Sequence, residues 1–437
     1  MPQQNKNKSI GLMICIALVI GNMIGSGIFL LPASLAHYGG VSIVGWIAST
    51  IGAIMTALVF VRLSKKFPKQ GGPYRYAYDN FGSLAGFSVA WSYWISIWCG
   101  NAAISVAAVA YLSVFFPSLN TQPIYAVIVA FVLIWSLTIL NMRGVRQAGY
   151  FQVISTVLKL IPLIVIGIAA FFVFEPQAFV PFNLTQQPLS TSIAATAALT
   201  LWAFLGMESA TVPAGNVKNP SITIPRATII GVLVTATIYI SSQITVMSVV
   251  PNAQLQISGA PFADAARVIW GNWAGDIVAI GAIISCIGAL NGWILLQGQV
   301  PMTAARDKLF PQILADKNNQ GVSMPALVIS SLIVCLLVAT NYHDGMVAFF
   351  TFAIMVSTLG IFVPYILSIA AEFKSIKANW DNKKQYLNLI TTVLALLYCC
   401  WAISGIGTKP MMWGLVLILS GLPIYYVVYI KNRKPNG

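Results

Sequence analysis

The chain has 437 residues, of which 58% are hydrophobic and only 8% are charged. Soluble domains have about 25% charged residues, and a soluble fold could not cover so much apolar surface, so lipid must be the solvent for most of this chain. The net charge of +14 does not indicate a nucleic-acid partner, because the basic residues lie in short stretches between apolar segments.

Long apolar stretches recur along the chain, each close to the ~20 residues that a helix needs to cross a bilayer. The first is too long for the hydrophobic region of a signal peptide and has no convincing cleavage site, so we expect it to remain as a helix. The sequence therefore predicts an all-α integral membrane protein with about twelve transmembrane helices. Their expected ranges are 10–36, 40–66, 84–115, 123–141, 148–174, 191–213, 225–250, 274–304, 323–340, 345–371, 387–406 and 410–430.

Positive charge is unevenly distributed over the segments between these helices. All of the 24 Lys and Arg residues except Lys159, Arg267 and Lys409 lie in the two tails, or in and beside the loops that follow the even-numbered helices. Cytoplasmic loops collect positive charge. We therefore expect both termini to be cytoplasmic.

Two of the predicted helices contain helix-breaking residues near their middle. In the first, three glycines including Gly25 are followed by Pro32. Glycine costs about 1 kcal/mol in a helix relative to alanine, and proline removes a hydrogen bond. Close packing through small residues is the alternative explanation. The sixth helix favours interruption, because Gly206 precedes Pro213 by the same spacing that separates Gly25 from Pro32.

These matched breaks are five helices apart, and an odd number of crossings reverses the orientation of a segment in the membrane. We therefore predict a single transmembrane domain with an inverted repeat: residues 10–174 form one half, residues 191–371 the other, and residues 387–430 add two helices. Paired interrupted helices indicate a substrate site of a secondary transporter near the bilayer midplane.

The half-helix ends at such breaks suit a zwitterion. A freed helix N-terminus offers N–H groups to an anion, and a freed C-terminus offers carbonyls to a cation. We expect an α-carboxylate at Ser26 and Gly27 and an α-amine at the carbonyls of Met23 and Leu205. A neighbouring carboxylate and amine are the two charged groups of an amino-acid backbone.

Ionisable residues away from the loops are candidates for function. Glu208 is at the second break and Lys159 is in the middle of the fifth helix. Such residues are expensive in a bilayer and usually functional, although a structural partner for Glu208 and snorkelling of Lys159 are the alternatives. Burial disfavours the charged form of a side chain, so Lys159 and Glu208 are both candidates for proton coupling.

Aromatic and polar residues in the spans extend the candidate site. Trp202 and Trp293 lie away from the predicted span ends, and a tryptophan face can hold a cation. Asn101 and Ser357 are polar groups within apolar helices, where hydrogen bonding between helices is the alternative role.

An enzyme, a metal site or an ion channel is not indicated. No loop is long enough for a catalytic domain, and there is no Gly-rich phosphate loop or repeated filter motif. The cysteines have no CxxC spacing and no clustered histidines, which favours packing roles over metal or disulfide bonds. They are Cys15, Cys99, Cys286, Cys335, Cys399 and Cys400. We expect no cofactor.

Three segments carry a resemblance to a known family: GSGIF at 25–29, WAFLGMES at 202–209 and VKNP at 217–220. They resemble the amino acid/polyamine/organocation superfamily, and the similarity covers nearly the whole chain. Within it, the chain is similar to bacterial arginine/agmatine antiporters of the basic amino acid/polyamine group. The resemblance implies a LeuT-like fold, a homodimer in a bacterial inner membrane, and exchange of arginine for agmatine that supports acid resistance.

The resemblance also implies roles for individual residues. Ser26 and Gly27 would hold the substrate carboxylate, and the carbonyls of Met23 and Leu205 its amine. Trp202 would stack on the guanidinium. The far end of the guanidinium would be surrounded by Asn101, Ser357 and the carbonyls of Ser96 and Ile97. The site would be closed by Trp293, and a deeper gate would be formed by Tyr93, Glu208 and Tyr365.

Lys159 departs from the arginine/agmatine pattern. Some amino acid transporters of the same superfamily carry a lysine in this helix, facing the first break, in the place of a coupling sodium. The resemblance therefore leaves proton-coupled amino acid uptake as an alternative to exchange. Ornithine/putrescine and lysine/cadaverine are the alternative substrate pairs.

Overall fold

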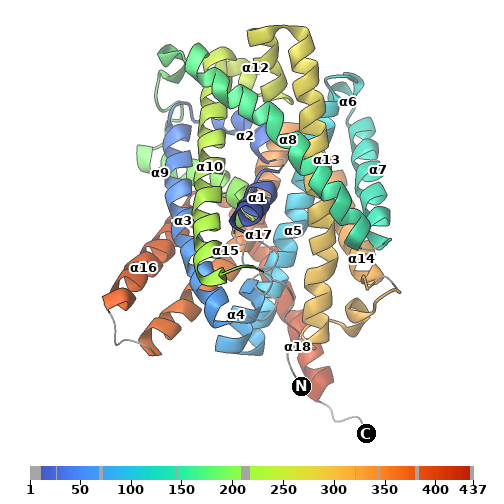
Figure 1. Cartoon of the computed structure of the whole chain (residues 1–437). Coiled ribbons are helices and arrows are strands. Elements are labelled where there is room, and N and C mark those ends of the chain that lie inside the picture. Colours follow the sequence, from blue (N-terminus) through green and yellow to red (C-terminus); the bar gives the residue numbers. More distant parts are fainter. Residues whose placement is uncertain are drawn as a thin grey trace.

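The computed structural model describes residues 11–25, 27–67, 72–143, 145–207, 217–319, 321–341, 345–378 and 383–433. All regular elements of these residues are helices, arranged as a bundle (Figure 1). Two predicted site residues, Ser26 and Glu208, lie outside the described residues.

Eight helical segments of the described chain are long and apolar enough to cross a membrane. They are α3 (Val41–Lys66), α5 (Ser83–Leu112), α7 (Pro123–Met142), α10 (Pro220–Val249), α13 (Asn272–Arg306), α15 (Met346–Ala378), α16 (Lys383–Ser404) and the pair α17 (Thr408–Leu419) and α18 (Gly421–Arg433). Apolar helices or half-helices that are shorter occupy the other predicted spans: α1 (Leu12–Met23), α2 (Gly27–Ala36), the second half of α8 (Val145–Val173), α9 (Leu189–Leu201) and α14 (Met324–Asn341). The predicted all-α membrane fold is confirmed.

The helices between the spans are short. α4 (Gly72–Phe81) and α12 (Pro261–Trp270) are the longer ones, at opposite ends of the bundle (Figure 1). The others are α6 (Ser118–Thr121), α11 (Asn252–Leu255) and the 3-10 turns η1 (Pro176–Phe179) and η5 (Gln312–Ala315), whereas the 3-10 turn η2 (Trp202–Phe204) continues α9 within its span.

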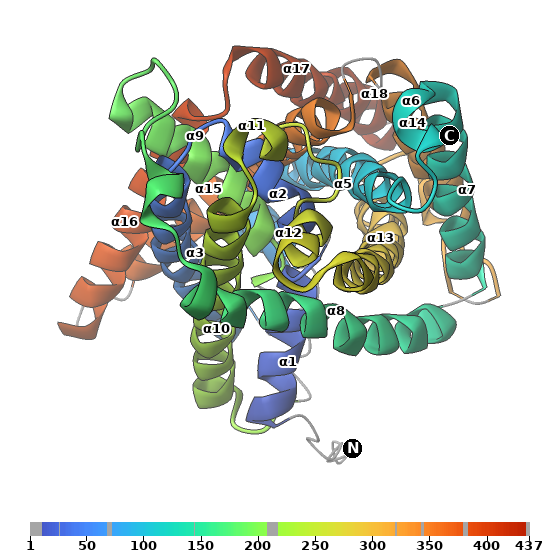
Figure 2. The same cartoon turned by 90° about the horizontal axis from the view of Figure 1, so that it is seen from above.

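The core of the bundle is built around α5. In the most apolar window of α5, 94% of the residues are buried within the protein, against 22% for α16 and 11% for the α17–α18 span. Figure 2 shows α16, α17, α7 and α8 along the rim of the bundle. Polar side chains on α5 are therefore shielded from lipid, whereas α16–α18 present apolar side chains to it.

Helix packing in one half has a counterpart in the other. α3 packs on α9 as α10 packs on α1, and α5 packs on α15 as α13 packs on α8. These pairs follow the order of a five-helix repeat. α1 lies across the bundle axis, since it is seen nearly end-on in Figure 1 and at full length in Figure 2.

A close crossing of α5 and α15 depends on Gly360. A Cβ atom at this position would lie only 2.7 Å from the carbonyl oxygen of Ser92 and 3.1 Å from the Cβ of Ser96. The missing side chain lets the two backbones approach. This crossing brings Ser357 of α15 against Ser96 of α5.

Candidate substrate site at two helix breaks

The chain leaves helical geometry at both predicted breaks. α1 ends at Met23, where the capping residue Ile24 is extended with ψ at 99°, and α2 begins at Gly27. The second break starts at Leu205, which is also extended with ψ at 134°, and continues at Gly206 with φ at +101°. A positive φ of this size favours glycine. The predicted departure from helical geometry is confirmed at both glycine-containing segments, whereas Pro32 lies inside α2 and Pro213 lies outside the described residues.

Side chains from other helices bind the freed carbonyls of the first break. The Lys159 ammonium on α8 donates to the carbonyl of Gly21 at 2.5 Å, and the Ser285 hydroxyl on α13 donates to that of Gly25 at 3.4 Å. Lys159 is only 1% exposed inside the span, and its amine lies at the first break. A cation at a helix C-terminus is electrostatically favourable.

Tyr239 of α10 connects the two breaks, a contact that the sequence analysis missed. Its hydroxyl donates to the carbonyl of Met23 at 2.9 Å, and the carbonyl of Ala203 lies 3.2 Å from the same oxygen. Its ring packs between Trp46 and Phe204. A tyrosine in the middle of an apolar span was the available signal. Met23 keeps one carbonyl lone pair for a ligand.

Trp202 stands beside the start of α2. A Cβ at Gly27 would overlap the six-membered part of the indole, with Cε3 at 2.7 Å. The indole nitrogen donates to the Ser357 hydroxyl at 3.2 Å, and the Phe350 ring packs edge-on at 5.8 Å. These contacts hold an aromatic face next to the N–H groups that begin α2.

Ser357 and Ser96 form a saturated pair behind Trp202. The Ser357 hydroxyl donates to the Ser96 carbonyl at 2.8 Å, and the two hydroxyl oxygens are 3.0 Å apart. The Ser357 oxygen thus accepts from Trp202 and from the Ser96 hydroxyl. Ile97, whose carbonyl is the other predicted acceptor on α5, is buried beside Ser96. The predicted proximity of Trp202, Ser96 and Ser357 is observed.

Asn101 lies one residue beyond Gly100 and is fully buried on α5. Its neighbour Gly100 faces this cluster, since a Cβ at Gly100 would lie 3.5 Å from the Ser357 hydroxyl oxygen and 4.0 Å from the Trp202 indole nitrogen. Its amide nitrogen donates to Gln297 of α13 at 2.7 Å. Gln297 was missed by sequence reasoning, although a glutamine in an apolar span is itself a signal.

The predicted gating residues occupy different levels of the bundle. Trp293 lies half-buried on α13, one turn before Gln297. Tyr365 is buried on α15 with its ring 5.1 Å from that of Phe60. It follows Ser357 toward the α4 end by a helical rise of about 12 Å. Tyr93 is half-buried on α5. The positions of these three side chains do not test whether they act as gates, so the gating roles stay predictions.

The α12 end of the site is closed by aromatic residues. The Tyr111 hydroxyl of α5 donates to the carbonyl of Phe29 on α2 at 2.8 Å and accepts from the amide of Phe262 on α12 at 3.3 Å. The Phe29 and Phe262 rings are 5.4 Å apart, and all three side chains are fully buried. A substrate at the breaks is therefore separated from the α12 surface.

Ion pairs tie the helices together at the α4 end. Arg62 of α3 binds the fully buried Glu372 of α15 at 2.8 Å. On α4, the Tyr74 hydroxyl donates to Asp307 at 2.6 Å, and Arg75 lies 3.7 Å from the same carboxylate. Burial, with the bond to Asp307, raises the pKa of Tyr74 well above its ordinary value. Tyr74 therefore remains a neutral hydrogen-bond donor at physiological pH.

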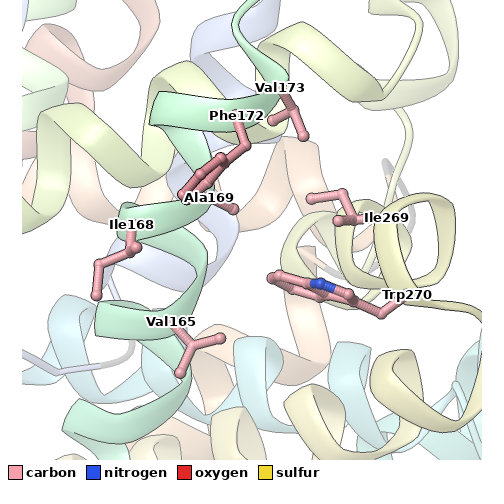
Figure 3. Close-up of a pocket in the computed structure, with 7 residues that line it drawn as sticks. All are labelled: Val165, Ile168, Ala169, Phe172, Val173, Ile269 and Trp270. Carbon is pink, nitrogen blue, oxygen red and sulfur yellow. The ribbon is translucent and has the colours of Figure 1, made fainter.

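A separate apolar pocket of about 390 Å³ lies between α8 and the end of α12 (Figure 3). Its lining residues are Val165, Ile168, Ala169, Phe172, Val173, Ile269 and Trp270. No ionisable side chain is among them, and Phe172 is largely exposed on the outer face of α8. This pocket does not suit a charged, polar substrate.

A bundle of membrane helices with two breaks facing each other near its middle is the architecture of a secondary transporter. A model of the amino acid permease family matches residues 10–430. The chain belongs to this family, within the amino acid/polyamine/organocation superfamily.

Similar proteins include antiporters from several bacteria. A cadaverine/lysine antiporter of Escherichia coli strain K12 is 34% identical over 98% of this chain and 97% of its own. An arginine/agmatine antiporter of Chlamydia pneumoniae is 31% identical, with 99% of this chain and 92% of its own covered. An arginine/ornithine antiporter of Pseudomonas aeruginosa is 28% identical, with coverage of 99% and 93%.

Proposed function

We propose that this protein exchanges a cationic amino acid for its decarboxylated amine by alternating access, with arginine and agmatine as the first candidate pair. The observation that carries the proposal is the indole of Trp202 against Gly27, at the first turn of α2. This arrangement joins a surface for a cation to N–H donors for a carboxylate. The similarity to three antiporters of cationic amino acids supports it.

The proposed binding mode assigns one part of the substrate to each feature. The α-carboxylate meets the start of α2 at Gly27 and at Ser26, which is outside the described residues. The α-amine meets the carbonyls of Met23 and Leu205. The cationic tail lies on Trp202, and its far end reaches Asn101. The amine product keeps the tail contacts and lacks only the carboxylate, so one site can serve both ligands.

Exchange of this kind moves charge. When the outgoing amine carries one positive charge more than the incoming amino acid, each cycle exports one charge, worth ~2.3 kcal/mol per 100 mV. Coupled to a cytoplasmic decarboxylase, which consumes a proton, the cycle would support acid resistance. Lysine/cadaverine is the second candidate pair, favoured by the 34% identical relative. Ornithine/putrescine is the third.

Proton-coupled amino acid uptake is the alternative function, and the contact of Lys159 with Gly21 favours it. Loss and return of a proton at the buried Lys159 amine, which contacts the end of α1, would couple protonation to the first break. Uptake into vesicles without internal substrate, driven by a proton gradient and abolished in Lys159→Ala, would support this alternative.

The basic residues support an orientation with the α4 end in the cytoplasm. Lys65, Lys66, Arg75 and Lys374 lie on α3, α4 and α15 at that end, where α18 also ends (Figure 1). The positive-inside rule then puts both termini in the cytoplasm of a bacterium. The exposed apolar faces of α16–α18 offer a surface for a homodimer in the inner membrane.

A counterflow experiment tests the proposed function. Labelled arginine or lysine is presented to proteoliposomes loaded with agmatine, cadaverine, putrescine, ornithine or buffer. We expect uptake only with an internal cationic amine, fastest with the matching one. Trp202→Leu should weaken binding of the cation by about 30-fold, because a desolvated cation–π contact is worth about 2 kcal/mol. Unchanged exchange by Trp202→Leu would refute the assigned role of the indole.

A further inference from the structure

A chain of buried hydrogen bonds runs from Asn101 away from the breaks. The Asn101 amide nitrogen donates to Gln297 Oε1 at 2.7 Å, and Gln297 Nε2 lies 2.8 Å from the Ser331 hydroxyl of α14. The Ser331 and Thr138 hydroxyls are 2.7 Å apart, and Thr138 of α7 donates to the carbonyl of Ile134 at 2.7 Å. All four side chains are fully buried.

The end of this chain fixes its direction. The Ile134 carbonyl can only accept, so the single hydroxyl proton of Thr138 is used there. Ser331 must then donate its own proton to Thr138, and its oxygen accepts from Gln297. The nitrogen of the Gln297 amide therefore faces Ser331, and its oxygen faces Asn101.

The Gln297 oxygen determines which way the Asn101 amide points. Its nitrogen must face the Gln297 oxygen, so its own oxygen is directed elsewhere. That oxygen, Oδ1, is buried and has no hydrogen-bond partner among the described residues. An unsatisfied buried acceptor is costly and creates a demand for a donor.

We propose that Gln297, Ser331 and Thr138 are positioning residues that hold the Asn101 amide as a hydrogen-bond acceptor for the cationic end of the substrate. This inference rests on the proposed cationic substrate class and deepens it. An ammonium or guanidinium group carries donors and no acceptor. An Asn101 amide turned the other way would present N–H groups to a cation and repel it.

Asn101 Oδ1 differs from the oxygens of Ser96 and Ser357, because it has no hydrogen-bond partner among the described residues. The Ser96 carbonyl already accepts from Ser357, and the Ser357 oxygen already accepts from Trp202. Fixing the amide before the ligand arrives also avoids a loss of affinity, because apparent affinity falls in proportion to the fraction of molecules in the competent orientation.

The test measures binding of labelled arginine, agmatine and cadaverine to the purified full-length protein, which does not depend on whether transport is exchange or proton-coupled. Ser331→Ala removes the acceptor for Gln297, and Thr138→Val frees the Ser331 proton. Either substitution lets the side-chain amides of Asn101 and Gln297 flip together. We expect Kd to rise about two- to tenfold for each probe, as the competent fraction falls.

A matched control and a second background separate positioning from general stability. Ser330→Ala removes the adjacent hydroxyl of α14, which bonds to the backbone carbonyl of Gln297 and not to its amide. It should leave Kd unchanged. In an Asn101→Asp background, acceptor oxygens face both ways, so Ser331→Ala and Thr138→Val should no longer affect Kd.

The outcomes distinguish two failures. Wild-type protein that binds none of the cationic probes would show that the proposed substrate class is wrong, and this inference with it. Wild-type protein that binds them, with Kd unchanged in Ser331→Ala and Thr138→Val or shifted equally in the Asn101→Asp background, would overturn the inference and leave the proposed function standing.

Discussion

Adding one methyl group at Gly27 tests the geometry of the site. An alanine Cβ there would lie 2.7 Å from Cε3 of Trp202, well inside van der Waals contact. The indole cannot retreat freely, because its nitrogen is bonded to Ser357 and the Phe350 ring packs edge-on against it. Overpacking of this kind costs about 1–3 kcal/mol. Since the strain displaces the ring that is proposed to hold the substrate, affinity should fall by about five- to 150-fold.

The assay for Gly27→Ala is equilibrium binding of labelled arginine and agmatine in detergent, followed by counterflow in proteoliposomes. Gly259→Ala adds the same methyl group where the nearest atom, the Ala110 carbonyl oxygen, is 3.6 Å away, and it should behave as wild type. In a Trp202→Leu background, Gly27→Ala should cause little further loss. Wild-type affinity in Gly27→Ala, or an equal loss in both backgrounds, would refute the reasoning.

Three further substitutions probe the scaffold. Tyr239→Phe removes the hydroxyl that binds carbonyls at both breaks, and unfolding in detergent should show a loss of about 1–3 kcal/mol; unchanged stability would contradict this. Glu372→Gln leaves the Arg62 charge largely uncompensated and should cost about 3–5 kcal/mol, with recovery in a double variant that also carries Arg62→Met. Tyr111→Phe weakens the closure at α12, so hydrogen exchange around Phe262 should accelerate about tenfold; an unchanged rate would argue against a closing role.

The features that sequence revealed are those with a local cause. Clustered glycines lower the helix propensity of a segment whatever its surroundings, and the chain leaves helical geometry near Gly25 and at Gly206, as expected. Lys159 was predicted to be buried because it is in the middle of an apolar span. An apolar pattern predicts that a helix exists but says little about where it ends. α15 continues to Ala378, past the predicted end at residue 371, because Glu372 is paired with Arg62 and can remain buried.

Partners chosen by tertiary packing were not predictable. Tyr239 could as well have been an interfacial aromatic, since only the fold brings its hydroxyl to both breaks. Asn101 was correctly placed in the core, but its pairing with Gln297 depends on how α5 meets α13. The direction of α1 across the bundle likewise follows from its packing on α10 and not from its own composition (Figure 2).

The central claim, exchange of a cationic amino acid for an amine through one site, is tested most directly by measuring both fluxes in the same vesicles. Proteoliposomes are loaded with labelled agmatine or cadaverine, and efflux is followed with and without external arginine or lysine. The proposal predicts that amine leaves only when amino acid is present outside, one molecule for each that enters. Amine retention together with amino acid uptake into empty vesicles under a proton gradient would contradict it and identify a proton-coupled importer.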